Sequence, residues 1–261
     1  MTDEPVRSLA TPPEPPPGRG LLAGRTAVVT AAAGTGIGYA TAERFLAEGA
    51  RVLVSDAHER RLKEAADRLG VPSQVCDVTD EDQVQELFAA AERELGGADV
   101  VVNNAGLGGT ADIVDMTDEQ WSKVLDVTLN GTFRCTRAAL RHLRERGGGA
   151  IVNNASVLGW RAQAGQAHYA AAKAGVMALT RCAAVEAAAY GVRVNAVAPS
   201  LAMHPFLAKV TTEELLDELT EREAFGRAAE PWEVANVIVF LASDYASYMV
   251  GEVIPVSSQR A

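Results

Sequence analysis

Several features that would indicate other classes of protein are missing from this sequence. Its 261 residues include only three cysteines, Cys76, Cys135 and Cys182, and no CxxC pair. An odd number of cysteines without metal-ligand spacing favours free thiols in a reducing compartment over a disulfide framework or a metal site. No uncharged apolar run reaches the roughly 18 residues of a membrane-spanning helix, and the N-terminus lacks the pattern of a secretory signal. These absences predict a cytoplasmic protein.

Positive charge is also scarce. The 24 Lys and Arg residues stand against 34 Asp and Glu residues, which gives a formal net charge of −10. An acidic surface argues against nucleic acid and anionic membranes as partners, because both carry negative charge themselves. We therefore expect the partner of this chain to be a small molecule.

Proline is concentrated near the N-terminus. Thr11–Gly20 reads TPPEPPPGRG, which offers few apolar side chains to bury and few backbone donors for a sheet. We expect residues 1–20 to form a flexible tail outside the fold. One domain would then cover residues 21–261, a length that suits a single large α/β domain.

From Arg25 onward, short apolar runs alternate with longer segments of helical periodicity. This alternation predicts right-handed βαβ crossovers and an α/β fold with a doubly wound, Rossmann-like parallel sheet. The segment 200–230 is polar and is predicted to be a substrate loop. The predicted strands are 27–29, 51–55, a short one at 75, 99–103, 150–153, 192–197 and 252–256. The predicted helices are 37–48, 58–69, 81–95, 118–145, 167–189 and 231–242.

A glycine-rich turn, TAAAGTGIG, follows the first predicted strand and leads into a helix. Glycines let the backbone approach a pyrophosphate, and the free N–H groups at a helix N-terminus attract it. The strand–turn–helix context therefore predicts a dinucleotide site, and a tight turn without a ligand is the alternative. The turn residues expected to contact the cofactor are Thr30, Gly34, Thr35, Gly36 and Ile37.

Asp56 ends the second predicted strand, 18 residues after Gly38, and bears on the choice of cofactor. At this spacing a carboxylate accepts hydrogen bonds from the adenosine ribose, and its charge would repel the 2′-phosphate of NADP. Arg60 and Arg61 are close in sequence, but they fall in the next helix, where they can face solvent. The sequence therefore favours NAD over NADP.

Tyr169 and Lys173 are four residues apart in a predicted helix, so their side chains share one face. Ser156 follows a strand whose carboxyl end borders the ligand crevice of such a sheet. Oxidation of an alcohol requires a base, and an ammonium beside tyrosine would lower its usual pKa of about 10 by roughly 1–3 units. The three residues predict hydride transfer between a nicotinamide and a secondary alcohol or ketone, with Ser156 holding the substrate oxygen.

Together these motifs resemble those of the short-chain dehydrogenase/reductase family, over residues 21–261. Four further segments carry the resemblance: Asp77–Val78, Asn103–Gly106, Tyr169–Lys173 and Asn195–Pro199. The resemblance implies cofactor contacts beyond the phosphate turn. These are Asp77 and Val78 at the adenine, Asn104, Ala105 and Gly106 at the ribose, Tyr169 and Lys173 beside the nicotinamide, and Pro199 and Ala202 at its carboxamide.

The sequence also departs from the family pattern. The phosphate turn is one residue longer than usual, and alanines replace its first glycine. Thr128 stands where an asparagine usually completes a catalytic tetrad, so its hydroxyl or its backbone carbonyl would hold the water of a proton relay. His204 replaces a threonine near the nicotinamide amide, and Ser257–Gln259 replaces a C-terminal glycine pair.

These departures are similar to one branch of the family, actinobacterial dehydrogenases of steroid catabolism. That likeness implies a bulky, ring-hydroxylated CoA thioester from rings C and D as substrate. Trp160, Arg161 and His204 are the candidate substrate contacts, with packing or solvent-facing roles as alternatives. Two other functions stay open: a reductase of acyclic 3-oxoacyl thioesters (carried by ACP or CoA) that uses NADPH, and a non-catalytic dinucleotide sensor.

The predicted helix at 167–189 is rich in alanine. Small residues allow helices to approach closely, either on the sheet or across a symmetric interface. The family resemblance implies a homotetramer or homodimer built through this helix and the one near 120–145.

Overall fold

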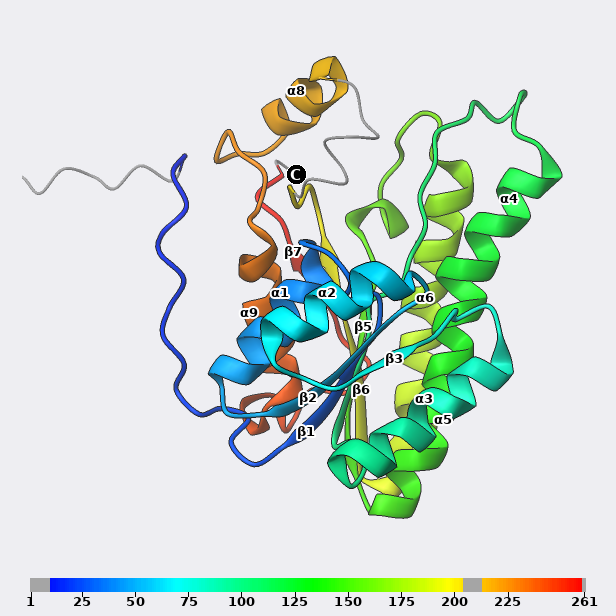
Figure 1. The fold of residues 1–261 in the computed structure, drawn as a ribbon. Helices are drawn as coiled ribbons and strands as arrows, with labels where there is room; N and C mark the ends of the chain where they lie inside the picture. The colour runs from blue at the N-terminus through cyan, green and yellow to red at the C-terminus, as the bar shows by residue number, and fades with distance from the viewer. Residues whose placement is uncertain (1–9, 204–212, 260–261) are drawn as a thin grey trace, which may run out of the picture.

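The computed structural model describes residues 10–203 and 213–259. Within them, seven parallel strands form one sheet in the order β3-β2-β1-β4-β5-β6-β7, with helices on both faces (Figure 1). The strand order reverses between β1 and β4, and open α/β sheets bind their ligands at such a switch point. The predicted doubly wound α/β fold is confirmed.

The elements match the predicted ones closely. The strands are β1 (Thr26–Val29), β2 (Arg51–Asp56), β3 (Ser73–Val75), β4 (Val100–Asn103), β5 (Gly149–Asn154), β6 (Val192–Pro199) and β7 (Val253–Val256). The helices are α1 (Ile37–Ala47), α2 (Glu59–Leu69), α3 (Glu81–Leu95), α4 (Asp118–Leu125), α5 (Gly131–Arg146), α6 (Ala167–Ala187), α8 (Glu213–Glu221) and α9 (Pro231–Ala242). Shorter helical turns are η1 (Asp126–Asn130), η2 (Val157–Gly159), η3 (Ala188–Tyr190) and η4 (Asp244–Ala246).

Helices pack on both faces of the sheet, and each strand contributes to two cores. The helices α1, α2 and α9 cover one face, where Val29 and Phe45 are buried. The helices α3, α5 and α6 cover the other face, where Val28 and Leu143 are buried. Successive side chains of a strand point to opposite faces, so neighbours such as Val28 and Val29 enter different cores. This explains why the strands are unbroken apolar runs in the sequence.

The structure refines one predicted helical region and differs from the prediction in another segment. The helical region predicted over 118–145 consists of α4 and α5, joined by the π-helical turn η1. The segment 200–230, predicted as a loop, contains α8. The polar composition of α8 concealed its leucines at 215, 216 and 219, which recur at helical spacing.

The end of the proline-rich segment is fastened to α1. The Arg44 guanidinium donates a 2.8 Å hydrogen bond to the carbonyl oxygen of Pro16. The Glu48 carboxylate accepts hydrogen bonds from the N–H groups of Arg19 (2.8 Å) and Leu21 (3.0 Å). Arg44 and Glu48 also form a buried ion pair at 2.7 Å. The last residues of the expected tail are thus tied to the domain, while the flexibility of residues 1–20 as a whole stays a prediction.

Candidate active site

The glycine-rich turn joins β1 to the N-terminus of α1. In the described residues, no side chain caps that helix end, whose N-cap is Gly36, so backbone N–H groups of the first turn can bind an anion. Gly38 lies so close to the turn that a Cβ there would be 2.3 Å from the carbonyl oxygen of Ala31. Ala31 itself has a φ of 52°, in the left-handed region that favours glycine, so the alanine keeps a glycine-like backbone at some strain. These features fit the pyrophosphate of a dinucleotide.

Thr30 and Asn104 tie this turn to the segment after β4. The Thr30 hydroxyl accepts hydrogen bonds from the N–H groups of Asn104 (2.9 Å) and Ala105 (3.2 Å). The Asn104 amide donates in return to the carbonyl oxygens of Thr30 (3.2 Å) and Ala31 (3.1 Å). The predicted phosphate and ribose contacts are therefore brought together in one hydrogen-bonded unit.

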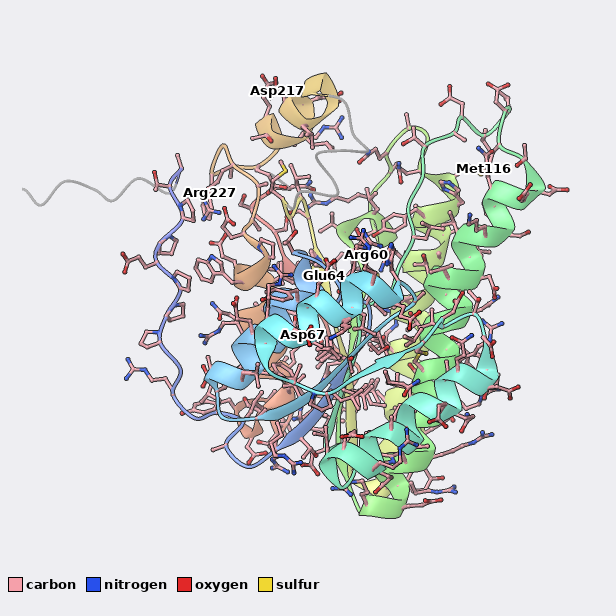
Figure 2. The ribbon with its side chains drawn as sticks, viewed as in Figure 1. Arg60, Glu64, Asp67, Met116, Asp217 and Arg227 are labelled. Carbon is pink, nitrogen blue, oxygen red and sulfur yellow. The ribbon has the colours of Figure 1, made fainter. Side chains whose placement is uncertain are left out.

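Asp56 ends β2 beside the turn. Its carboxylate accepts hydrogen bonds from the N–H groups of Ala33 (3.2 Å) and His58 (2.9 Å). Arg60 pairs with Glu64 at 3.2 Å on the exposed side of α2, where Figure 2 labels both residues. The predicted solvent-facing position of Arg60 is therefore confirmed.

Arg68 is a cation near the turn that the sequence motifs did not point to. Its guanidinium lies 4.8 Å from the centre of the Tyr39 ring and donates a long 3.5 Å hydrogen bond to the carbonyl oxygen of Gly34. Arg68 belongs to the last turn of α2, and nothing in the sequence signals that its side chain reaches back to the turn before α1. It brings positive charge to the glycine-rich turn.

Asp77 and Val78 follow β3, where the adenine contact is expected. The Asp77 carboxylate accepts hydrogen bonds from the N–H group (2.9 Å) and hydroxyl (2.8 Å) of Thr79, which shapes the turn. Val78 is buried against Gly131, where a Cβ would lie 2.5 Å from the valine side chain. The segment is therefore held against α5, and the adenine contact stays a prediction.

Ser156, Tyr169 and Lys173 meet at the carboxyl end of β5. The Ser156 hydroxyl accepts a 3.2 Å hydrogen bond from the N–H group of Leu158 and also forms a hydrogen bond with the Tyr169 phenol. The Lys173 ammonium donates a 2.6 Å hydrogen bond to the carbonyl oxygen of Asn154 and lies 5.5 Å from the centre of the Tyr169 ring. The predicted convergence of the three side chains is present.

Burial sets the protonation of this group. Burial raises the pKa of Tyr169 to about 12, and the hydrogen bond with Ser156 offsets part of the rise. Burial also lowers the pKa of Lys173 to about 8. The lowered tyrosine pKa expected from the sequence is therefore wrong for this chain, because desolvation favours the neutral form of both groups. At neutral pH the site presents a protonated phenol.

Thr128 lies in the π-helical turn η1, a kind of insertion that occurs often at functional sites. Its hydroxyl donates to the carbonyl oxygen of Leu107 and accepts from the N–H group of the same residue, both at 3.0 Å. Its own carbonyl oxygen accepts a 2.7 Å hydrogen bond from Thr132. The exposed Asn130, two residues later, instead donates a 3.1 Å hydrogen bond from its amide to the carboxylate of Asp126. The Thr128 hydroxyl uses its proton and one of its two acceptor positions in fastening the segment after β4, and a role in a proton relay stays a prediction.

Asn154 is a site residue that the sequence motifs did not select. Its carbonyl oxygen accepts from Lys173, and its side-chain amide donates a 2.8 Å hydrogen bond to Asn104. Its Oδ1 atom is buried and has no hydrogen-bond partner in the described part of the chain. Asn154 therefore connects the lysine to the phosphate turn. The available signal was a polar residue at the end of an otherwise apolar strand.

Of the predicted substrate contacts, Trp160 and Arg161 follow η2, shortly after Ser156 in the chain. Trp160 is half-exposed, and the exposed Arg161 guanidinium donates a hydrogen bond to Gln259. His204 lies outside the described residues. His168 is buried, and its Nδ1 atom accepts a 2.9 Å hydrogen bond from the N–H group of Tyr169.

The chain beyond β6 returns to the same edge of the sheet. Pro199 ends β6 and is buried, and Ala202 forms an isolated parallel bridge with Ala229. Arg227, labelled in Figure 2, binds Glu233 through two hydrogen bonds of 2.7 and 2.8 Å. These contacts anchor the start and the end of the segment 200–230, and the cofactor contacts expected at Pro199 and Ala202 stay predictions.

The cysteines contribute no reactive group to this site. All three are free thiols, and burial raises the pKa of Cys76 to about 12. No group of three metal-ligating side chains occurs within the described ranges. In the same ranges, a helix with the length and apolar character needed to cross a membrane is absent.

Known proteins are similar to this chain in sequence and fold. A family model described as enoyl-(acyl carrier protein) reductase matches residues 31–258. The crystal structure of a short chain dehydrogenase from Mycobacterium smegmatis matches with a TM-score of 0.87 and 57% identity, over 97% of this chain and 100% of that chain. The chain belongs to the short-chain dehydrogenase/reductase family.

Two relatives of this short-chain dehydrogenase/reductase have specific names. The (5R,7aS)-5-hydroxy-7a-methyl-1-oxo-2,3,5,6,7,7a-hexahydro-1H-indene-carboxyl-CoA reductase of Mycobacterium tuberculosis is 62% identical over 260 residues, which cover 97% of this chain and 99% of that protein. The cis-4-hydroxycyclohexanecarboxylate dehydrogenase of Sinomonas cyclohexanicum is 45% identical over 243 residues, which cover 90% and 96%. As a short-chain dehydrogenase/reductase, the protein is an oxidoreductase that uses a nicotinamide dinucleotide and acts on a small molecule. The predicted family and enzyme class are confirmed.

Proposed function

We propose that this enzyme interconverts a secondary alcohol and a ketone on the ring of a bulky CoA thioester from steroid C/D-ring breakdown, with NAD(H) as cofactor. The reaction type is inferred from the convergence of Ser156, Tyr169 and Lys173 beside the phosphate turn. The names of the two relatives support the substrate class. Both describe a carbocyclic ring that bears a hydroxyl group and a carboxyl group, linked to CoA in one case and free in the other.

The side chains suit ketone reduction at neutral pH. The bound nicotinamide supplies the hydride in reduction and accepts it in alcohol oxidation. The Ser156 hydroxyl donates a hydrogen bond to the substrate oxygen, and the Tyr169 phenol, protonated because burial raises its pKa to about 12, donates the proton to that oxygen. The Lys173 ammonium then stabilises the phenolate that remains.

Different residues around the phosphate turn bind different parts of the cofactor. The N-terminus of α1 binds the pyrophosphate, and Asp56 accepts hydrogen bonds from the adenosine ribose. Asn104 and Asn154 connect this region to Lys173, so binding of the cofactor and placement of the lysine depend on the same hydrogen bonds.

A spectrophotometric screen of NADH oxidation tests the substrate. We expect kcat/KM to be at least about tenfold higher for steroid-derived ring-ketone CoA thioesters than for acyclic 3-oxoacyl thioesters, a difference of about 1.4 kcal/mol in transition-state binding. Activity on the acyclic set alone would identify the enzyme as the alternative 3-oxoacyl-thioester reductase. Tight NADH binding without turnover across the whole panel would instead favour the dinucleotide sensor.

The cofactor preference is tested by comparing kcat/KM for NADH and NADPH. We expect the wild type to prefer NADH by about tenfold or more, because the Asp56 carboxylate repels a 2′-phosphate. Asp56→Ser should lower the ratio of kcat/KM for NADH to kcat/KM for NADPH, whereas Arg68→Gln should leave the preference for NADH in place. A wild type that prefers NADPH, and loses that preference in Arg68→Gln, would contradict the proposal and assign the phosphate to Arg68.

We further propose that the enzyme works in the cytoplasm as a homotetramer or homodimer formed through α5 and α6. The free thiols support the location. The small side chains of α6 and the exposed apolar residues Phe133 and Val185 on these two helices support the interface.

A further inference from the structure

The C-terminal residues Ser257–Gln259 run between two segments that border the candidate active site. One segment, 157–166, follows Ser156, and the other, 200–230, follows β6. Both segments start at the carboxyl edge of the sheet, where ligands of this fold bind. A contact that joins the two segments therefore lies at the same edge of the sheet as the candidate active site.

Glu223 joins the C-terminal residues to the segment 200–230. Its side chain is almost completely buried, with 2% of the residue exposed. Its carboxylate accepts hydrogen bonds from the Ser258 hydroxyl at 2.7 Å and the Ser258 N–H group at 3.2 Å. It also accepts a longer bond of 3.4 Å from the N–H group of Leu201, two residues after the end of β6.

The backbone reinforces this connection. The N–H group of Ala224 donates a 2.6 Å hydrogen bond to the carbonyl oxygen of Ser258, and Glu223 forms an isolated antiparallel bridge with Gln259. A buried carboxylate is costly unless its oxygens accept hydrogen bonds. Among the described residues, Glu223 meets that requirement through Leu201 and Ser258, so its burial is tied to this arrangement of the two segments.

Arg161 joins the C-terminal residues to the other segment. Its guanidinium donates a hydrogen bond to the side-chain oxygen of Gln259. The backbone N–H group of Gln259 in turn donates a 3.0 Å hydrogen bond to the Ser257 hydroxyl. The acceptor for Arg161 is a neutral amide, and none of the ion pairs within residues 10–203 and 213–259 involves this residue. The arginine is therefore held in place while its positive charge stays available to an anionic group.

We propose that these four residues, Arg161, Glu223, Ser258 and Gln259, form a C-terminal clasp that builds one wall of the substrate site and sets its affinity for the CoA thioester. Glu223 acts as a positioning residue, and Arg161 faces the negative charge of the substrate. The substrate class named here rests on the proposed function. The contacts are made by side chains at 258 and 259, where the glycine pair typical of the family would supply none.

The clasp predicts a change in substrate affinity without a change in chemistry. Ser258→Ala removes the 2.7 Å bond to Glu223, and we expect KM for the CoA thioester to rise about tenfold, as for the loss of one hydrogen bond to a charged group. We expect kcat and KM for NADH to stay at wild-type values, since Tyr169 and the phosphate turn are untouched. Ser258→Thr restores the hydroxyl and should restore KM, and Ser247→Ala, at an exposed serine after η4, is the matched control.

A double-mutant comparison tests the arginine. Arg161→Gln and Gln259→Ala should each raise KM for the thioester, and the double variant should be no worse than Arg161→Gln, because Gln259 acts through the arginine. The KM for a ring ketone without CoA should change little in all three. Unchanged KM for the thioester in Ser258→Ala and in Arg161→Gln, with a wild type that turns it over, would overturn the proposal.

Hydrogen–deuterium exchange separates failure of the clasp from failure of the proposed substrate. In Ser258→Ala without substrate, we expect faster exchange at the amides of Leu201 and Ala224 than in the wild type or Ser247→Ala. If the wild type turns over no CoA thioester, the proposed substrate is wrong, whatever the exchange shows. Exchange at both amides that is unchanged by Ser258→Ala would refute the clasp itself.

Discussion

Tyr169→Phe is expected to lower kcat by roughly 10²- to 10⁴-fold, the usual contribution of one general acid or base. The substitution removes the hydroxyl group that donates the proton to the substrate oxygen and keeps the ring that fills the site. NADH affinity, measured by fluorescence titration, should stay within about twofold, because the residues of the phosphate turn are unaltered. The loss should therefore fall on kcat.

Tyr245→Phe is the matched control, because this tyrosine is 75% exposed after α9 and far along the chain from the site residues. It should retain wild-type turnover and wild-type thermal stability. Turnover by Tyr169→Phe that approached the wild-type rate would exclude the phenol as the proton donor and leave Ser156 as the remaining hydroxyl in the group.

Lys173 should make ketone reduction depend on pH around its own lowered pKa of about 8. The ammonium form, which stabilises the phenolate, is present below that pKa and is lost as the pH rises through it. In the wild type, log(kcat/KM) should therefore fall above pH 8, since this parameter reports groups of the free enzyme. In Lys173→Met the rate should be much lower, by about 10²-fold, and that fall should be missing, because methionine does not titrate.

Lys123→Met is the control for this profile, since Lys123 is exposed on α4. It should keep both the rate and the fall above pH 8. A Lys173→Met variant that still showed the fall would assign the titration to another group.

The same shift has a consequence for stability. Burial lowers the pKa of Lys173 from its ordinary value of 10.5 to about 8, so the folded state binds this proton more weakly than the unfolded state. The resulting destabilisation is fully present below pH 8 and is relieved as the pH rises from 8 toward 10.5. Denaturant unfolding should therefore show a larger free energy of unfolding for Lys173→Met than for the wild type below pH 8. The loss of the hydrogen bond to Asn154 offsets part of this gain, and the gain should shrink as the pH rises above 8.

The fold could be predicted from the sequence because the strands are continuous apolar runs, as expected for strands buried on both faces. Val28 and Val29 are adjacent, and each is needed in a different core. Such runs, separated by helical segments, admit few other architectures. The helix α8 was not predicted, because its many acidic residues drew attention away from the helical spacing of its leucines. The π-helical turn at Thr128 was not predicted either, because neither the helical nor the strand period of apolar residues indicates such a turn.

The candidate site was predictable where it depends on spacing along one element. Tyr169 and Lys173 share a helical face, and Gly36 and Gly38 share a turn. The residues that were missed act through partners distant in sequence: Asn154 bonds a side chain 50 residues away, and Glu223 bonds one 35 residues away. The raised pKa of Tyr169 could not be foreseen either, because desolvation depends on the whole surrounding fold and not on the neighbouring lysine.

The contacts of the proline-rich segment with α1 also impose an order on folding. Pro16 is synthesised 28 residues before Arg44, and Arg19 is synthesised 29 residues before Glu48. Both partners lie in the last turns of α1 or just after it, and they face one another only once that helix has formed. The segment around Pro16 and Arg19 therefore leaves the ribosome early and reaches its native contacts late, after the helix that receives it is complete.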